Sequence, residues 1–87
     1  MATYRVFVKA SAAKEIERLP AKKLRRAIVA RIRMLAEEPR PPGCVKLSGA
    51  GKYRLRHADY RILYEIVDDR LVVTVVRVAH RKIAYRR

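Results

Sequence analysis

The sequence predicts an α+β domain in which a helical hairpin covers one face of a small, mainly antiparallel β-sheet. Apolar residues recur with a helical spacing of three or four positions from residue 12 to residue 37, and they alternate with polar residues before and after that segment. This change of period gives the order β-α-α-β-β-β. With 87 residues, of which 51% are apolar, residues 1–87 are expected to form a single domain with one core.

The first strand and the first helix are expected near the N-terminus. Residues 3–9 alternate between apolar and polar side chains, which is typical of a short strand. Ser11 can accept a hydrogen bond from a free backbone N–H, so it should cap a helix over residues 12–19. Pro20 has no N–H to donate and should end that helix.

A second helix is expected from about residue 21 to residue 37. Its apolar stripe consists of Leu24, Ala27, Ile28, Ile32 and Leu35. The proline-rich run at residues 39–43 then ends regular structure. Residues 45–47 are predicted to be a short extended piece, followed by a flexible glycine-containing loop at residues 48–51.

The rest of the chain should form three strands joined by two short turns. His57 is expected to face Tyr60 across the first turn. Leu55 then pairs with Ile62, because a slip by one residue would split the core. The core face of this hairpin holds Tyr53, Leu55, Tyr60, Ile62, Tyr64 and Ile66. The opposite face collects the cations Lys52, Arg54, Arg56 and Arg61.

The second turn is expected at residues 68–70, with Val67 opposite Leu71. In that register the core face of the last strand gains Val72, Thr74, Val76 and Val78. The other face gains Val73, Val75, Arg77 and, by the same alternation, Arg81. The face away from the helices should therefore be open and cationic.

The charge balance points to a polyanionic partner. Twenty-two Lys and Arg residues against eight Asp and Glu residues give a net charge of +14. Such an excess repels itself in a compact protein, and RNA, DNA or an acidic protein would relieve it. A basic protein with a merely solvated surface is the alternative interpretation.

The sequence also predicts a cytoplasmic protein without a membrane partner. Cys44 is the only cysteine, so neither an internal disulfide nor a metal–thiolate cluster can form, as suits a reducing cytosol. No apolar run approaches the ~18 residues that a spanning helix needs. The N-terminus lacks the pattern of a signal peptide, so the mature protein is expected to be the whole chain.

The residues that could carry chemistry are cations, tyrosines and two histidines. The sequence contains no phosphate-binding glycine loop, no paired metal ligands and no spaced Ser–His–Asp set, so we expect neither a cofactor nor a metal. This set suits RNA cleavage in which the 2′-hydroxyl attacks the adjacent phosphate. The substrate then supplies its own nucleophile, and the protein must orient it, neutralise charge and handle two protons. A plain RNA-binding module is a weaker alternative.

Two stretches of the sequence resemble RelE-type toxins of bacterial toxin–antitoxin pairs. They are L-R-H-A-D-Y-R-I-L-Y-E-I at residues 55–66 and L-V-V-T-V-V-R-V-A-H-R-K-I-A-Y-R at residues 71–86. The resemblance covers essentially the whole chain. It implies a RelE-like fold and a toxin that inhibits translation by cutting mRNA in the ribosomal A site, held inactive by a cognate antitoxin in a toxin–antitoxin hetero-oligomer. The related ParE-like toxins poison DNA gyrase without being nucleases, and this activity is the alternative.

The resemblance also assigns roles to individual residues. Arg61 and Lys52 would hold the scissile phosphate, with Arg54 beside them. Arg81 would support the leaving 5′-oxygen, and Tyr85 would stack on a base or orient the 2′-hydroxyl. For each, a structural alternative remains: a solvated charge on the strand, or a tyrosine packed against the domain.

One position departs from the RelE pattern. Arg54 stands where those nucleases carry a second lysine, a suggested general base. Because arginine stays protonated, it can bind phosphate but is a poor proton acceptor. His80 is a possible substitute base, since imidazole titrates near neutral pH, although its strand parity predicts that it faces the core. His57, at the turn, is a weaker candidate.

Overall fold

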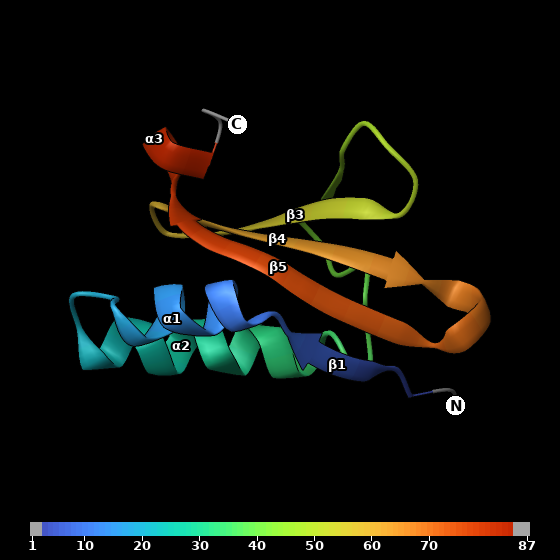
Figure 1. Ribbon diagram of the computed structural model, residues 1–87, viewed down its shortest axis with the longest axis horizontal. Helices are drawn as coiled ribbons and strands as arrows, with labels where there is room; N and C mark the ends of the chain where they lie inside the picture. Colours follow the sequence, from blue (N-terminus) through green and yellow to red (C-terminus); the bar gives the residue numbers. More distant parts are fainter. Residues whose placement is uncertain (1–2, 85–87) are drawn as a thin grey trace.

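The computed structural model describes residues 3–84 and has the predicted α+β architecture. Its elements are β1 (Arg5–Val8), α1 (Ala10–Glu17), α2 (Lys22–Met34), β2 (Val45–Lys46), β3 (Lys52–His57), β4 (Tyr60–Val67), η1 (Asp68–Arg70), β5 (Val72–His80) and α3 (Arg81–Ala84). The strands form one sheet in the order β1-β5-β4-β3-β2, in which β1 is parallel to β5 and the other pairs are antiparallel. Helices α1 and α2 lie on one side of this sheet, and the short α3 lies on the other (Figure 1).

The first helix begins earlier than predicted. It spans Ala10–Glu17, and its N-cap residue is Lys9, which makes no side-chain capping hydrogen bond. The expectation that Ser11 caps the helix is therefore wrong, because Ser11 already lies within the first turn. The helix still ends before Pro20, as expected from the missing N–H of proline.

The core lies between the two long helices and the sheet. Its buried members include Ala12 and Leu19 from the α1 region, Ile28, Ile32 and Leu35 from the α2 region, and Tyr53, Leu55, Ile62, Tyr64, Ile66, Val73, Val75 and Val78 from the sheet. The predicted apolar stripe of the second helix is confirmed at Ile28, Ile32 and Leu35. The other two stripe residues, Leu24 and Ala27, are half-buried, and Leu24 packs against the same core.

The hairpin of β3 and β4 has the predicted register. His57 pairs with Tyr60 and Leu55 pairs with Ile62. Leu55 and Ile62 are buried against the helices. The residues that alternate with the buried ones along each strand therefore point to the face away from α1 and α2. We call this side of the sheet the open face.

The predicted facing of β5 is wrong over its first half. Leu71 adopts a left-handed backbone conformation with φ of 53°, so β5 starts one residue later and Val67 pairs with Val72. Val73 and Val75, rather than Val72, Thr74 and Val76, consequently face the core and are fully buried.

A shift in register then restores the predicted facing. Tyr64 pairs with Val75, whereas the preceding Leu63 pairs with Arg77, so Val76 has no partner on β4 and forms a β-bulge. Beyond the bulge the alternation reverses, and Val78 is buried as predicted.

A polar cluster fastens the proline-rich loop to the sheet. The guanidinium of Arg40 donates hydrogen bonds to both carboxylate oxygens of Asp68 and to the hydroxyl of Tyr53. The Tyr4 hydroxyl donates to Asp68 Oδ1 at 2.6 Å, and the Tyr64 hydroxyl donates to the Pro39 carbonyl at 2.8 Å. The loop that connects α2 to β2 is thereby held against the end of β4.

Candidate functional site

Three arginines lie next to one another on the open face. Arg54 and Arg56 alternate with the buried Tyr53 and Leu55 along β3, and Arg61 lies directly opposite Arg56 on β4. Residues that face each other across an antiparallel pair have Cβ atoms about 5 Å apart. We call Arg54, Arg56 and Arg61 the arginine cluster.

Arg61 is the buried member of this cluster. Only 6% of its surface is exposed, although its strand position puts it on the open face. Its Nη1 donates a hydrogen bond to the Tyr60 carbonyl at 3.3 Å. Its partner on β5 is Ala79, and at this end of the sheet α3 contacts both β4 and β5. A guanidinium held in this way is oriented before any ligand arrives.

Arg81 adjoins the arginine cluster at the same end of the sheet. It is the first residue of α3, two positions after Ala79, the residue that pairs with Arg61. Its backbone N–H donates to the Asp59 carbonyl in the β3–β4 turn at 2.7 Å. This bond fixes where α3 starts, and the side chain of Arg81 is exposed there.

Lys52 lies farther along β3, beside a carboxylate rather than beside Arg61. It pairs with Glu65 of β4, and both residues line a cavity of about 280 Å³. The other residues that line this cavity are Leu47, Tyr53, Leu63, Tyr64 and Val76. Of the predicted phosphate-binding cations, Arg61 and Arg81 lie at one end of the open face, Arg54 lies midway along it, and Lys52 lies at the other end.

Arg77, predicted on the cationic face, is compensated by an acid from α1. Its Nε donates to Glu15 Oε2 at 3.3 Å. The other oxygen of Glu15 accepts the backbone N–H of Val78 at 2.8 Å. Sequence reasoning missed Glu15, because its partners are 62 and 63 residues away in the chain.

His80 lies on the helix-covered side of the sheet, as its parity predicted. It pairs with Tyr60, and the two rings meet edge to face with centroids 5.5 Å apart. Its Nδ1 accepts the backbone N–H of Lys82 at 3.3 Å. The imidazole therefore points away from the arginine cluster, and its acceptor nitrogen is already engaged. His57, which pairs with Tyr60 from the other strand, has the same facing.

Tyr85 lies outside the described residues. Within residues 3–84, no three His, Cys, Asp or Glu side chains come together as a metal site would require. In the same part of the chain, no helix is both long enough and apolar enough to cross a membrane.

A second cationic surface lies on the outer side of α2. The helix starts with Lys22 and Lys23, has no acidic residue in its first turn, and has no side-chain cap at Ala21. Cations at a helix N-terminus oppose the helix dipole. A cavity of about 500 Å³ lies along this side, lined by Arg25, Arg26, Val29, Ala30 and Arg33. Arg25 Nε is buried there without a hydrogen-bond partner among the described residues.

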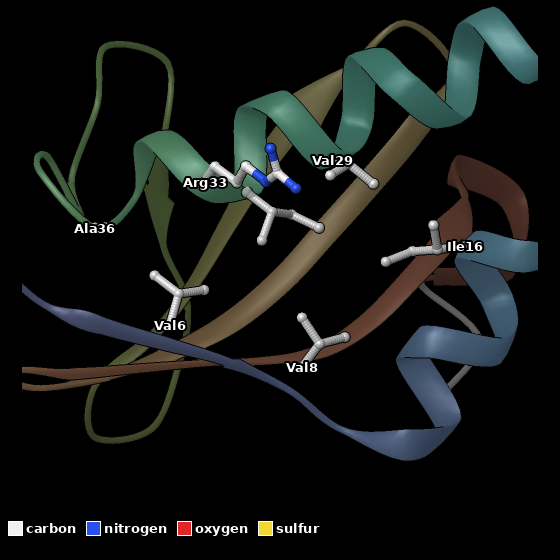
Figure 2. A pocket seen from close by; sticks show the side chains of 7 residues that line it. Val6, Val8, Ile16, Val29, Arg33 and Ala36 are labelled. Atoms are coloured by element: carbon white, nitrogen blue, oxygen red, sulfur yellow. The ribbon is translucent and has the colours of Figure 1, made fainter.

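An apolar groove runs between β1 and the two long helices. Figure 2 shows Val6 and Val8 of β1 facing Val29 and Arg33 of α2, with Ile16 of α1 at one end. Its volume is about 290 Å³. Strand β1 is the last strand on this side of the sheet, so its outer edge pairs with no other strand in the described chain. An unpaired edge beside an apolar groove is a surface that an extended or helical peptide can occupy.

Comparison with known proteins agrees with the fold and with the resemblance in the sequence. A family model described as the ParE toxin of the type II toxin–antitoxin system parDE matches residues 6–85. The chain is 32% identical to Toxin RelG of Mycobacterium tuberculosis over 85 residues, which cover 97% of this chain and 98% of the relative.

Solved structures of toxin–antitoxin complexes have the same architecture. The archaeal RelE–RelB complex from Pyrococcus horikoshii OT3 matches with a TM-score of 0.83 and 30% identity, over 93% of this chain and 98% of that chain. The intact Escherichia coli RelBE complex matches with a TM-score of 0.75 and 25% identity, over 88% and 95% of the two chains. The chain therefore belongs to the RelE/ParE superfamily of type II toxin–antitoxin toxins, and it is a toxin of the RelE type.

Proposed function

We propose that this toxin is a ribosome-dependent mRNA endoribonuclease that uses the 2′-hydroxyl of its substrate and no metal. The observation that carries the proposal is the arginine cluster, in which Arg56 and Arg61 are directly opposed and Arg54 is adjacent. Like charges in this arrangement destabilise a sheet. A phosphate bound between them would accept charge-assisted hydrogen bonds from both guanidinium groups.

Each cation has a role in the proposed reaction. Arg61, with Arg54 beside it, would hold the scissile phosphate and stabilise the negative charge that develops on it. Arg81 would stabilise the leaving 5′-oxygen. Lys52 would contact the neighbouring part of the RNA, and Tyr85 would stack on a base or orient the 2′-hydroxyl. The 2′-oxygen forms a bond to phosphorus as the bond to the 5′-oxygen breaks, which leaves a 2′,3′-cyclic phosphate and a 5′-hydroxyl.

His80 does not fit the role of general base. A base must offer an acceptor lone pair to the 2′-hydroxyl, directly or through one water. The Nδ1 lone pair of His80 already accepts the Lys82 N–H, and the ring lies on the other side of the sheet. We therefore assign it a packing role against Tyr60.

The outer side of α2 supports docking on the ribosome. Lys22 and Lys23 raise the energy of an isolated helix whose N-terminus is already positive. Contact with the phosphates of ribosomal RNA would remove that cost and release counterions. On this account the open face meets the mRNA while α2 meets the ribosome, in the cytoplasm where translation occurs.

A cognate antitoxin is the second proposed partner. The two solved structures compared above are complexes of RelE with RelB. The apolar groove in Figure 2 and the adjacent edge of β1 offer such a protein both apolar contacts and backbone hydrogen bonds. The resulting species would be a toxin–antitoxin hetero-oligomer.

Mapping of mRNA 5′ ends tests the proposal. After induction of the toxin in growing cells, we expect cuts that keep a fixed phase within codons and occur only in translated messages. Arg61→Ala and Arg81→Ala should abolish these cuts. Arg70→Ala, in the turn at the opposite end of β4, should retain them and serves as the charge-matched control. Circular dichroism of each purified variant would show that its fold is unchanged.

The alternative function is inhibition of DNA gyrase. The family model that matches the chain is named for ParE toxins, so this activity belongs in the same experiment. Intact transcripts together with arrested supercoiling would exclude the nuclease and favour the gyrase inhibitor.

A further inference from the structure

Glu65 is the one carboxylate that the strands place on the open face. Along β4, Arg61, Leu63 and Glu65 alternate with the buried Ile62, Tyr64 and Ile66. The chain has eight carboxylate side chains, all within the described residues. The other seven lie on helices, in turns or in loops: Glu15, Glu17, Glu37, Glu38, Asp59, Asp68 and Asp69.

The surroundings of Glu65 form a site rather than a flat strand surface. Glu65 is half-buried and lies opposite Lys52 on one side and Thr74 on the other. Glu65 and Lys52 both line the cavity of about 280 Å³ on this part of the sheet. The β-bulge residue Val76 lines it as well. Bulges occur preferentially beside active sites, where they change the direction of side chains.

Glu65 also lies within reach of RNA bound by the arginine cluster. Four strand positions separate it from Arg61, or about 13 Å between Cα atoms at ~3.3 Å per residue. Arg54, which pairs with Leu63, lies between them. An RNA chain that crosses the open face from Arg61 past Arg54 would therefore come close to the Glu65 carboxylate.

The proposed reaction requires a proton acceptor that the other residues of the site do not provide. Arginine stays protonated, so the arginine cluster and Arg81 cannot accept the proton of the 2′-hydroxyl. His80 faces the other side of the sheet, and its Nδ1 already accepts a hydrogen bond. A carboxylate is an acceptor-only group when ionised, and Asp and Glu are established general bases.

We propose that Glu65 is the general base of this toxin. This proposal rests on the nuclease function proposed above. Glu65 takes the proton of the 2′-hydroxyl as the 2′-oxygen forms its bond to phosphorus. The bond between phosphorus and the 5′-oxygen then breaks, and the 5′-oxygen, paired with Arg81, takes a proton from water. The carboxyl of Glu65 returns its proton to solvent, so the enzyme is restored.

The test is single-turnover cleavage of a defined mRNA on purified ribosomes. Glu65→Gln keeps the size of the side chain but removes the base, so we expect the rate to fall by about 10²–10⁴-fold while ribosome binding is unchanged. Glu65→Asp keeps a carboxylate but shortens the side chain by one methylene, so this variant should retain part of the cleavage rate. Asp69→Asn, which removes an exposed carboxylate from the turn after β4, is the charge-matched control and should cut at the wild-type rate.

The pH dependence separates a base from a structural residue. The Glu65→Gln variant lacks the proposed base, so its cleavage should depend on hydroxide. Its cleavage rate should rise about tenfold per pH unit near neutrality, whereas the wild-type cleavage rate should rise less steeply. Parallel pH profiles for the wild type and Glu65→Gln, or equal rates, would overturn the proposal. Failure of the nuclease function is a different result, because in that case the wild-type protein itself would not cut.

Discussion

Arg56 and Arg61 lie directly opposite each other on β3 and β4, and Arg61 is only 6% exposed. Two guanidinium groups in facing positions repel, and the cost grows when one of them is removed from water. The facing positions concentrate positive charge at one place on the open face. A polyanionic ligand on the open face turns this same arrangement into a binding site, and this is the physical basis of the proposed nuclease.

Replacement of the exposed member of this pair should stabilise the isolated protein. We expect Arg56→Gln to raise the free energy of unfolding by about 0.2–1 kcal/mol, because it removes a like-charge cross-strand pair. The gain should shrink as salt screens the repulsion. Urea unfolding at low and high ionic strength measures both quantities, and a variant that is less stable than the wild type at low salt would contradict this reading of the pair.

The N-terminus of α2 should show opposite effects on stability and on binding. Replacement of Lys22 and Lys23 by glutamine removes two cations from the positive end of the helix, so each change should stabilise the free protein by about 0.3–1 kcal/mol. The same changes should weaken binding to ribosomes and reduce its salt dependence, since fewer phosphate contacts remain.

Thermal unfolding and sedimentation with purified ribosomes give the two readouts for α2. The double variant Lys14→Gln and Lys46→Gln removes the same charge from other parts of the fold and controls for the change in net charge. Equal loss of ribosome binding in both double variants would show that net charge, and not the side of α2, is responsible.

The alternation of apolar and polar residues predicted the strand pairing correctly where a single register buries all the large side chains. The β3–β4 hairpin is such a case, since any slip would expose Tyr53 or Tyr64. The facing of β5 was not predictable in the same way. Its first residues are apolar at almost every position, so either alternation would fill the core. The left-handed backbone conformation of Leu71 and the bulge at Val76 determine which of these residues face the core.

The candidate site was likewise predictable only in part. The sequence and the family resemblance pointed to Arg54, Arg61 and Arg81, and the structure places Arg61 and Arg81 at one end of the open face with Arg54 next along it. Neither pointed to Glu65. A single acidic residue in a predicted strand cannot be distinguished from an ordinary exposed residue until its cross-strand neighbours are known. The compensation of Arg77 by α1 also depends on a contact that is distant in the sequence.

Gly51 should be the least replaceable of the glycines. Its φ is +66°, and a Cβ atom added there would lie 2.5 Å from the Ile66 carbonyl oxygen, a backbone atom. Gly51→Ala should therefore lower the free energy of unfolding by about 1–3 kcal/mol and loosen the start of β3. Gly43 has a φ of +90° but open space around its Cα, so Gly43→Ala should cost less. Equal losses in urea unfolding would contradict the steric argument.

The cluster of Arg40 and Asp68 should make stability depend on acid pH. Hydrogen bonds from the Arg40 guanidinium and the Tyr4 hydroxyl lower the pKa of Asp68 in the folded protein below its usual value near 3.9. The stabilisation is thus complete above about pH 4 and is lost as the pH falls through the lower, folded-state pKa. Asp68→Asn should therefore destabilise the protein at pH 7 and do so less at pH 3.

Unfolding of the wild type, Asp68→Asn and Asp69→Asn across this pH range measures the effect. Asp69 is the neighbouring turn carboxylate, and its side chain is exposed. A difference between the wild type and Asp68→Asn that stays constant from pH 7 to pH 3 would show that the ion pair contributes nothing.

The nature of the cut RNA ends tests the central claim most directly. Purified toxin and programmed ribosomes are given two mRNAs that differ only in the 2′-group of the nucleotide on the 5′ side of the cut. We predict that the all-ribose mRNA is cut to a 2′,3′-cyclic phosphate and a 5′-hydroxyl, and that the 2′-deoxy mRNA stays intact at that position. Equal cleavage of both mRNAs, or a 5′-phosphate at the new end, would contradict attack by the 2′-hydroxyl within the arginine cluster.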